Sequence, residues 1–243
     1  MKIKCTFVVG PLFLAVASCH QMSQSLNERV LYCEDFNSYA EGSRLPTGWW
    51  CEGSKAVRIE KGRLRADANL DNNGENYGAS TIWLDRTFGG DLRVEFDAHV
   101  LASDGDKNNI NFFFLFGDPS GGSLSRTKDE RSDGEYGKYH TLNGYVFTFL
   151  ADGDPDKARF RMRDEPGFNL LQETFAYECR QNKTYHVTVT KKGNRITYAV
   201  DGAVYLDKVD DAANPEHKSG IIGFRTWHTD LWWDNVKVTE LHR

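Results

Sequence analysis

The segment from Leu92 to Val100 alternates strictly between apolar and polar residues. Successive side chains of a β-strand point to opposite faces, so this segment predicts a strand with one buried and one outward face. No stretch longer than about ten residues has apolar residues at the spacing of a helix face. Further short strand-like segments, separated by turns rich in Gly, Asn and Asp, cover 111–116, 145–150, 159–163, 185–191, 195–200, 203–206, 220–227 and 231–241. This order of elements predicts an all-β fold, an antiparallel sandwich or barrel.

The start of the chain is similar to the signal of a bacterial lipoprotein. Lys2 and Lys4 precede an apolar stretch, 6–17, that is too short to span a bilayer. The small residues before Cys19 match the lipobox, in which the cysteine is acylated and becomes the new N-terminus. We therefore expect a signal peptide over 1–18, a polar tether over 19–29 and one domain over 30–243.

An acylated Cys19 predicts a stable lipid anchor in the cell envelope. No acidic run follows the cysteine, which favours a periplasm-facing protein. Removing 1–18 takes away two lysines and no acids, so the formal charge falls from −5 to −7. That charge argues against nucleic acid as a partner, because nucleic-acid binding needs basic clusters. We expect membrane contact through the anchor alone.

Three cysteines, Cys33, Cys51 and Cys179, lie beyond Cys19. Cys33 and Cys51 either pair in the oxidising envelope, leaving Cys179 alone, or stay reduced. The sequence does not decide between these alternatives. The sequence contains no C-x-x-C motif and no Cys/His spacing of the kind that binds zinc, so we expect no structural zinc site.

Several blocks resemble known carbohydrate-related families. The opening segment, 31–49, and the closing segment, 232–238, resemble the concanavalin-A-like lectin/glucanase superfamily, which implies a two-sheet antiparallel jelly-roll sandwich. A closer resemblance, to the YesU-like family, rests on 77–83, 145–150, 159–168 and 223–228. It implies a poly- or oligosaccharide partner but no settled reaction. In many such jelly rolls the positions of Asp35 and Asp234 hold a structural calcium, which needs six to eight oxygens; a plain pair of strand-edge aspartates is the alternative.

Two strands supply the polar side chains of the expected groove. Glu95, Asp97 and His99 face outward on one strand, and Arg161 and Arg163 share one face of another. If these strands lie side by side, their guanidinium groups favour sugars with a carboxylate, the uronic acids. The alternative is a solvated surface on which the charges pair with one another.

His140, at the end of the long polar loop 117–141, is our candidate base for proton abstraction next to a uronate carboxylate, with Glu95 or Asp97 as the acid. An arginine would stabilise the developing negative charge. Retaining laminarinase-like enzymes of the superfamily carry Glu-x-Asp-x-x-Glu, but Val100 stands where the second glutamate belongs, which excludes their mechanism. Further sugar contacts are assigned to Tyr145, Arg225, Trp227 and His228.

Two functions follow from these patterns. The first is a lyase or glycoside hydrolase that acts on polysaccharide fragments, and the second is a glycan-binding lipoprotein without catalysis. The loop 117–141, as a lid or binding loop, favours the enzyme, although a solvated insertion is the alternative. The incomplete carboxylate motif favours the binding protein.

Overall fold

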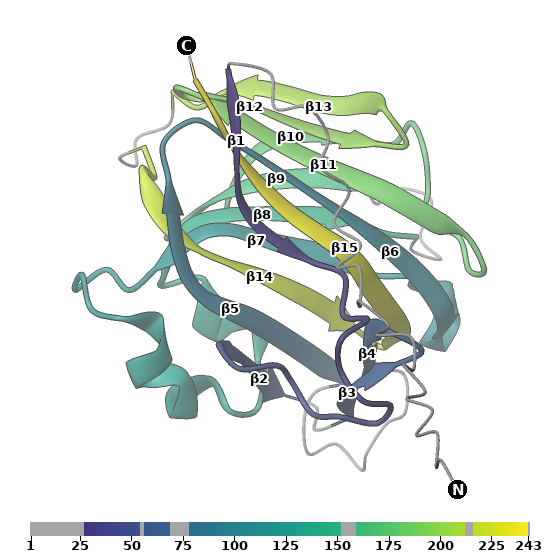
Figure 1. Ribbon diagram of the computed structural model, residues 1–243. Coiled ribbons are helices and arrows are strands. Elements are labelled where there is room, and N and C mark those ends of the chain that lie inside the picture. The colour runs from purple at the N-terminus through teal and green to yellow at the C-terminus, as the bar shows by residue number, and fades with distance from the viewer. Residues whose placement is uncertain (1–26, 54–55, 69–77, 152–158, 212–215, 243) are drawn as a thin grey trace, which may run out of the picture.

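The computed structural model, shown in Figure 1, describes residues 27–53, 56–68, 78–151, 159–211 and 216–242. The predicted lipidation residue, Cys19, and the predicted signal peptide lie outside these ranges. Two antiparallel sheets pack face to face, which confirms the predicted sandwich. Within the described ranges, no helix has the length and hydropathy of a membrane span.

Sheet A is the larger of the two layers. Its strands are, in spatial order, β13 (Ala203–Val209), β12 (Arg195–Val200), β11 (Thr184–Lys192), β6 (Leu92–Ser103), β15 (Thr229–Leu241), β4 (Arg63–Asp67) and β3 (Val57–Glu60), with β1 (Glu28–Glu34) paired to β15. Sheet B consists of β10 (Asn169–Thr174), β9 (Phe160–Glu165), β8 (Asn143–Phe149), β7 (Ile110–Gly117), β14 (Ser219–Trp227), β5 (Ala79–Gly89) and β2 (Trp49–Gly53).

The main hydrophobic core lies between the sheets and follows the alternation of the sequence. Between Leu92 and Val100, the apolar residues of β6 are buried, and its polar residues are half-buried on the outer face of sheet A. Phe96 of β6 packs against Phe112 of β7 and Phe224 of β14, with ring centroids 5.2 and 5.0 Å apart. Burial of such aromatic rings contributes about 2 to 3 kcal/mol each to the hydrophobic stabilisation.

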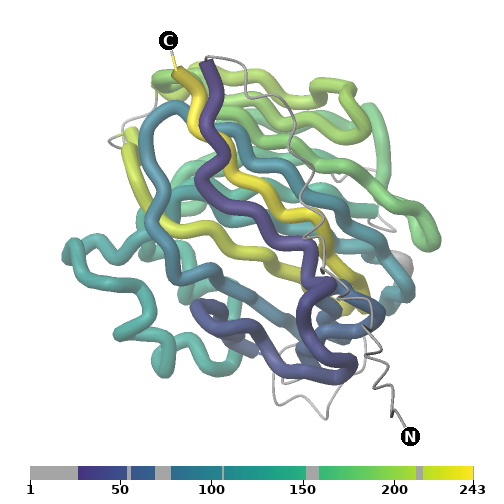
Figure 2. The backbone as a smooth tube through the Cα atoms, viewed as in Figure 1, coloured from purple at the N-terminus to yellow at the C-terminus, as the bar shows by residue number. Residues whose placement is uncertain are grey.

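The segment from 118 to 142 packs against the outer face of sheet B. It contains the short 3₁₀ helices η2 (Leu124–Arg131) and η3 (Tyr136–Tyr139), and Figure 2 shows it in teal beside the sandwich. Its side chains bury a second apolar cluster made of Trp83, Phe113, Phe116, Leu124, Tyr139, Leu142, Val146 and Ile221. The interpretation of this loop as a solvated insertion is therefore wrong. The strand β7, predicted to be covered on both faces, is covered by the other sheet and by this segment.

The shared groove expected from strands 92–100 and 159–163 does not exist. β6 lies in sheet A and β9 lies in sheet B, so their outward side chains face opposite sides of the sandwich. Alternation tells which side chains of a strand point outward, but long-range strand pairing decides which sheet the strand joins. Cys33 and Cys51 are also divided between the sheets, and no disulfide joins them.

Candidate functional site

A row of mostly polar residues crosses the outer face of sheet B, with one residue from each strand. Cross-strand pairing places these residues side by side, in the order Glu52, Thr81, Arg225, Asn111, Thr148, Arg161 and Glu173. Their chain neighbours, such as Phe112, Phe147 and Phe224, point into the main core. Because side chains alternate along a strand, the row points away from that core.

A cavity of about 440 Å³ opens over the middle of this row. Its lining residues are Asn109, Asn111, Tyr136, Thr148, Leu150, Arg161, Arg163, Phe168, Arg225 and Trp227. Three of these residues are arginines, and none of the lining residues that the structure describes carries a carboxylate. The cavity therefore has positive charge and a size typical of small-ligand sites.

Arg225 lies at the bottom of the cavity and is almost fully buried. One guanidinium nitrogen donates to Thr81 Oγ1 at 2.6 Å, and the guanidinium carbon lies 4.7 Å from the centre of the Tyr136 ring. In the described part of the chain, no carboxylate forms an ion pair with it. A buried charge is costly unless it is paired, so this arrangement is suited to an anionic ligand.

Arg163 and Arg161 of β9 flank the same cavity. Arg163 donates to the carbonyl of Phe168 at 2.9 Å, and its guanidinium carbon lies 3.9 Å from the centre of the Phe168 ring. Burial lowers the pKa of Arg163 from its ordinary value. Arg161 lies nearer to solvent, with Nε 3.6 Å from a carboxylate oxygen of Glu173. The two arginines thus frame the mouth, while Arg225 occupies the floor.

Two asparagines leave buried polar atoms at the cavity. The side-chain oxygens of Asn109 and Asn111 are buried and have no hydrogen-bond partner among the described residues. Buried polar atoms in proteins are almost always hydrogen-bonded, and exceptions occur where a ligand or water completes the bonding. Both residues line the cavity, so these amides are available to a bound hydroxyl or water.

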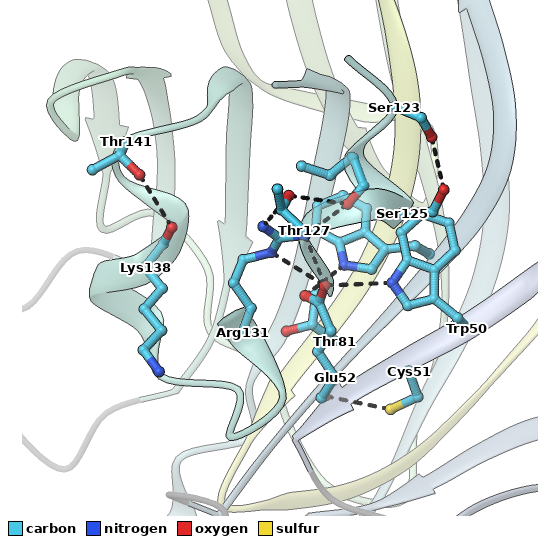
Figure 3. A network of polar contacts seen from close by, with 12 residues as sticks. Trp50, Cys51, Glu52, Thr81, Ser123, Ser125, Thr127, Arg131, Lys138 and Thr141 are labelled. Atoms are coloured by element: carbon cyan, nitrogen blue, oxygen red, sulfur yellow. Dashed lines mark hydrogen bonds and ion pairs between the residues drawn. The ribbon is translucent and has the colours of Figure 1, made fainter. Parts of the chain in front are cut away.

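The wall formed by Tyr136 is held in place by a buried ion pair. Figure 3 shows Arg131 of η2 against Glu52 of β2, with Arg131 Nε donating to Glu52 Oε1 at 3.1 Å. The indole nitrogen of Trp83 donates to Glu52 Oε2 at 2.9 Å. Both charged side chains are buried, so removal of one would leave the other uncompensated. This pair fastens the segment 118–142 to sheet B and thereby positions Tyr136 against Arg225.

His140 supports the cavity wall but does not line the cavity. Its ring stacks on Phe168 with centroids 3.9 Å apart, and it contacts the edge of Tyr136. Burial, followed by the charges of Arg163 and Arg225, lowers the pKa of His140, which favours the neutral ring. Its Nε2 is buried and has no hydrogen-bond partner in the described ranges.

Glu95, Asp97 and His99 are not part of this site. They lie on the outer face of sheet A, where His186 Nδ1 is 2.8 Å from Asp97 Oδ1. The hydrogen bond to Asp97, together with the Glu95 carboxylate 3.9 Å away, raises the pKa of His186 to about 9. The adjacent His186 ring, with the charges of Arg93 and Lys237, lowers the pKa of Glu95 to about 2.

The prediction that Glu95 or Asp97 acts as the acid beside His140 is wrong, since the two sheets separate them. His99 is likewise remote from the cavity. Its Nδ1 is 3.0 Å from Thr184 Oγ1, and its ring stacks on Trp232 at 5.1 Å. The outer charges of sheet A pair with one another, in agreement with the alternative prediction of a solvated surface with paired charges.

Tyr145 was also wrongly assigned to the sugar site. It lies in the main core, and its hydroxyl donates to Asp210 Oδ2 at 2.5 Å. Trp227, by contrast, lines the cavity at its rim and is partly exposed. His228 follows it but does not line the cavity; its Nδ1 lies 3.4 Å from Asp104 Oδ2.

The predicted calcium ligands, Asp35 and Asp234, are close enough for their charges to interact. Burial, with a smaller contribution from the charges of Asp97 and Asp35, raises the pKa of Asp234 to about 6. No group of three or more His, Cys, Asp or Glu side chains that could hold a metal ion occurs in the described ranges. Calcium at these two aspartates stays a prediction, and the backbone oxygens would have to supply most of its shell.

The sequence interpretation missed several cavity residues, above all Asn111, Thr148, Tyr136 and Phe168. A signal for two of them was present. Asn111 and Thr148 are polar residues within mainly apolar strands. The alternation of side chains along each strand places both of them on its outward side. Tyr136 and Phe168 come from irregular segments, whose positions over the sheet the sequence pattern does not specify.

Comparisons with known proteins give a family and a fold. A family model described as "Domain of unknown function (DUF6250)" matches residues 75–236. A search of curated proteins finds no match to this sequence. Among solved structures, a Bacillus subtilis protein of unknown function with a galectin-like fold is 18% identical, with a TM-score of 0.70; the match covers 88% of this chain and 97% of that chain.

Two further solved structures are similar to this chain. The carbohydrate recognition domain of Emp47p is 13% identical, with a TM-score of 0.56 over 89% of this chain and 98% of that chain. A protein reported with the endo-acting O-glycanases of the human gut microbiota is 14% identical, with a TM-score of 0.56; the match covers 88% of this chain and 100% of that chain. At these identities the likeness shows the fold, a galectin-like jelly roll.

Proposed function

We propose that this chain, which belongs to the DUF6250 family, binds an acidic oligosaccharide in the cavity on the outer face of sheet B. The observation that carries the proposal is the buried guanidinium of Arg225, which has no ion-pair partner in the described part of the chain and faces a cavity without carboxylates. A ligand carboxylate supplies the missing negative charge, and a planar guanidinium binds it with two parallel hydrogen bonds.

The remaining lining residues favour a sugar as the carrier of that carboxylate. The amides of Asn109 and Asn111 offer hydrogen bonds to hydroxyl groups, and their oxygens have no other described partner. Trp227 lines the cavity with its indole ring, and aromatic rings pack well against the apolar side of a sugar ring. The carbohydrate recognition domain of Emp47p shares the fold, and the sequence resemblance to the YesU-like family points the same way.

Binding, rather than cleavage, is the activity that these residues favour. General acid–base catalysis needs a group within hydrogen-bond reach of the reacting proton. No described lining residue is a carboxylate or a histidine, and His140 lies behind Phe168. The described lining residues therefore include no pair of carboxylates that could hydrolyse a glycosidic bond. A lyase is the competing outcome of the experiment below.

Isothermal titration calorimetry with a panel of uronate-containing oligosaccharides and matched neutral ones tests this proposal. We expect saturable binding of acidic members, weaker binding of neutral ones and no product after long incubation. New reducing ends or an unsaturated, ultraviolet-absorbing product would instead show an enzyme. Equal binding of neutral and acidic oligosaccharides would refute the role of Arg225.

We also propose that Cys19 anchors the protein in the cell envelope, facing the periplasm. The lipobox before it supports this location. Metabolic labelling with a radioactive fatty acid in a bacterial host tests the anchor. Label that is present in the wild type and lost in Cys19→Ala supports it, and an unlabelled wild-type protein contradicts it.

A further inference from the structure

The polar row across sheet B is buried from Glu52 to Thr148 and partly exposed at Arg161 and Glu173. Relative exposure is 2% at Glu52, 0% at Thr81, 2% at Arg225, 4% at Asn111 and 7% at Thr148. The side chains of Arg161 and Glu173 are 22% and 37% exposed. A groove that binds the middle of a long glycan chain must be open at both ends, so that the glycan can continue in both directions. This row is closed at the end formed by β2 and β5 and open at the end formed by β9 and β10.

The closed end is built by the segment 118–142. Tyr136 and Tyr139 lie over the guanidinium of Arg225, with ring centres 4.7 and 5.1 Å from its carbon. Beyond them, the buried pair of Glu52 and Arg131 holds the segment onto the sheet. Among the described residues, this ion pair and the packed apolar cluster occupy the space beyond Arg225 in this direction.

The most deeply buried positive charge without an acidic partner lies at the closed end. Arg225 is 2% exposed and has no ion pair within the described ranges; of the two arginines at the mouth, Arg163 donates to the Phe168 carbonyl and Arg161 has Glu173 at 3.6 Å. A ligand carboxylate is therefore attracted most strongly to the closed end of the cavity, where a glycan chain cannot continue. The next sugar would lie over Thr148 and Arg161 and lead out to solvent.

We infer that the cavity recognises the terminal acidic sugar of a glycan chain, with its carboxylate on Arg225, and not an internal stretch. This inference rests on the proposed function, because it specifies which part of an acidic glycan the same site takes. The ligand class is an oligosaccharide that ends in a uronic acid.

Counting binding sites per mass of polymer tests the inference. The probes are polygalacturonate, alginate and hyaluronate, each used intact and after partial acid hydrolysis to shorter chains of measured mean length. Titration of the full-length protein with equal masses gives the number of sites on each sample. If chain ends are bound, the number of sites per mass rises by the same factor as the number of ends. A capacity per mass that does not change on hydrolysis overturns end recognition while leaving acidic-glycan binding intact.

A failure of the proposed function gives a different result. In that case none of the three polymers binds, either intact or hydrolysed. Arg225→Met serves as the variant that should abolish the rise in capacity, and Arg195→Met is the matched control. Arg195 forms an exposed ion pair with Asp207 between β12 and β13 of sheet A and does not line the cavity. Loss of binding in both variants to the same degree would contradict a specific role for Arg225.

Discussion

Arg225→Met is the substitution that most directly tests the site. Methionine has a similar length and is apolar, so it fills the space and removes the guanidinium charge. Each hydrogen bond to a charged group contributes about 1.5 to 3 kcal/mol, and truncation of one partner of a buried charge pair costs about 2 to 5 kcal/mol. We therefore expect a loss of about 3 kcal/mol of binding free energy, or roughly 100-fold in Kd.

The same substitution should change stability much less than affinity. In the ligand-free protein, Arg225 donates to Thr81 at 2.6 Å and has no ion pair in the described residues. Loss of that hydrogen bond to a charged group costs about 1.5 to 3 kcal/mol, and removal of an unpaired buried charge offsets part of this cost. Urea denaturation should show a change in the free energy of unfolding below about 2 kcal/mol. A variant that fails to fold would show instead that Arg225 is needed for structure.

A double comparison isolates the contribution of charge. The tightest-binding acidic oligosaccharide of the panel is titrated calorimetrically beside the same molecule with its terminal carboxylate reduced to a hydroxymethyl group. Wild-type protein should discriminate strongly between the two, and Arg225→Met should bind both with similar affinity. Equal losses of affinity for the acidic and the reduced molecule would refute the reasoning, because the guanidinium would then not contact the carboxylate.

Three further predictions concern stability. Glu52→Gln should destabilise the fold by about 3 to 5 kcal/mol in urea denaturation, because it leaves the buried charge of Arg131 without its partner. Gly223→Ala should cost about 1 to 3 kcal/mol, since a Cβ there would overlap the packed Trp83 ring, which must shift. The pKa of His186 is raised from 6.5 to about 9, so its stabilising contribution is complete below pH 6.5 and is lost as pH rises to 9. NMR titration should give that pKa, and the free energy of unfolding should fall across this interval.

Each of these predictions has a control. For Glu52→Gln it is Arg195→Gln, which breaks an exposed ion pair and should leave the free energy of unfolding almost unchanged. For Gly223→Ala it is Gly117→Ala, where no atom lies within 4 Å of the added Cβ. For His186 it is His186→Gln, which should remove the fall in stability between pH 6.5 and 9. A substitution at Glu52 or Gly223 that costs no more than its control, or a His186 that titrates near 6.5, would contradict the corresponding argument.

The sequence predicts well which side chains of a single strand point inward and which point outward. The alternation of β6 assigned its buried and outward residues correctly, and the same rule places Tyr145 with Phe147 and Phe149 in the core. Tyr145 was misassigned because its position beside the polar loop was given more weight than its parity. Arg161, Arg163, Arg225 and Trp227 were assigned to a sugar site, and the structure brings all four to one cavity.

The sequence by itself thus determined the β-class of the fold, the inward and outward sides of its strands and the residue types suited to an acidic sugar. These properties depend on local alternation, which acts over a few residues of one strand. Only the tertiary structure decided that β6 and β9 belong to different sheets and that the segment 118–142 covers part of one outer face. Those outcomes depend on pairing and packing between residues far apart in the chain, where the free energies of alternative arrangements differ through contacts that no local pattern records.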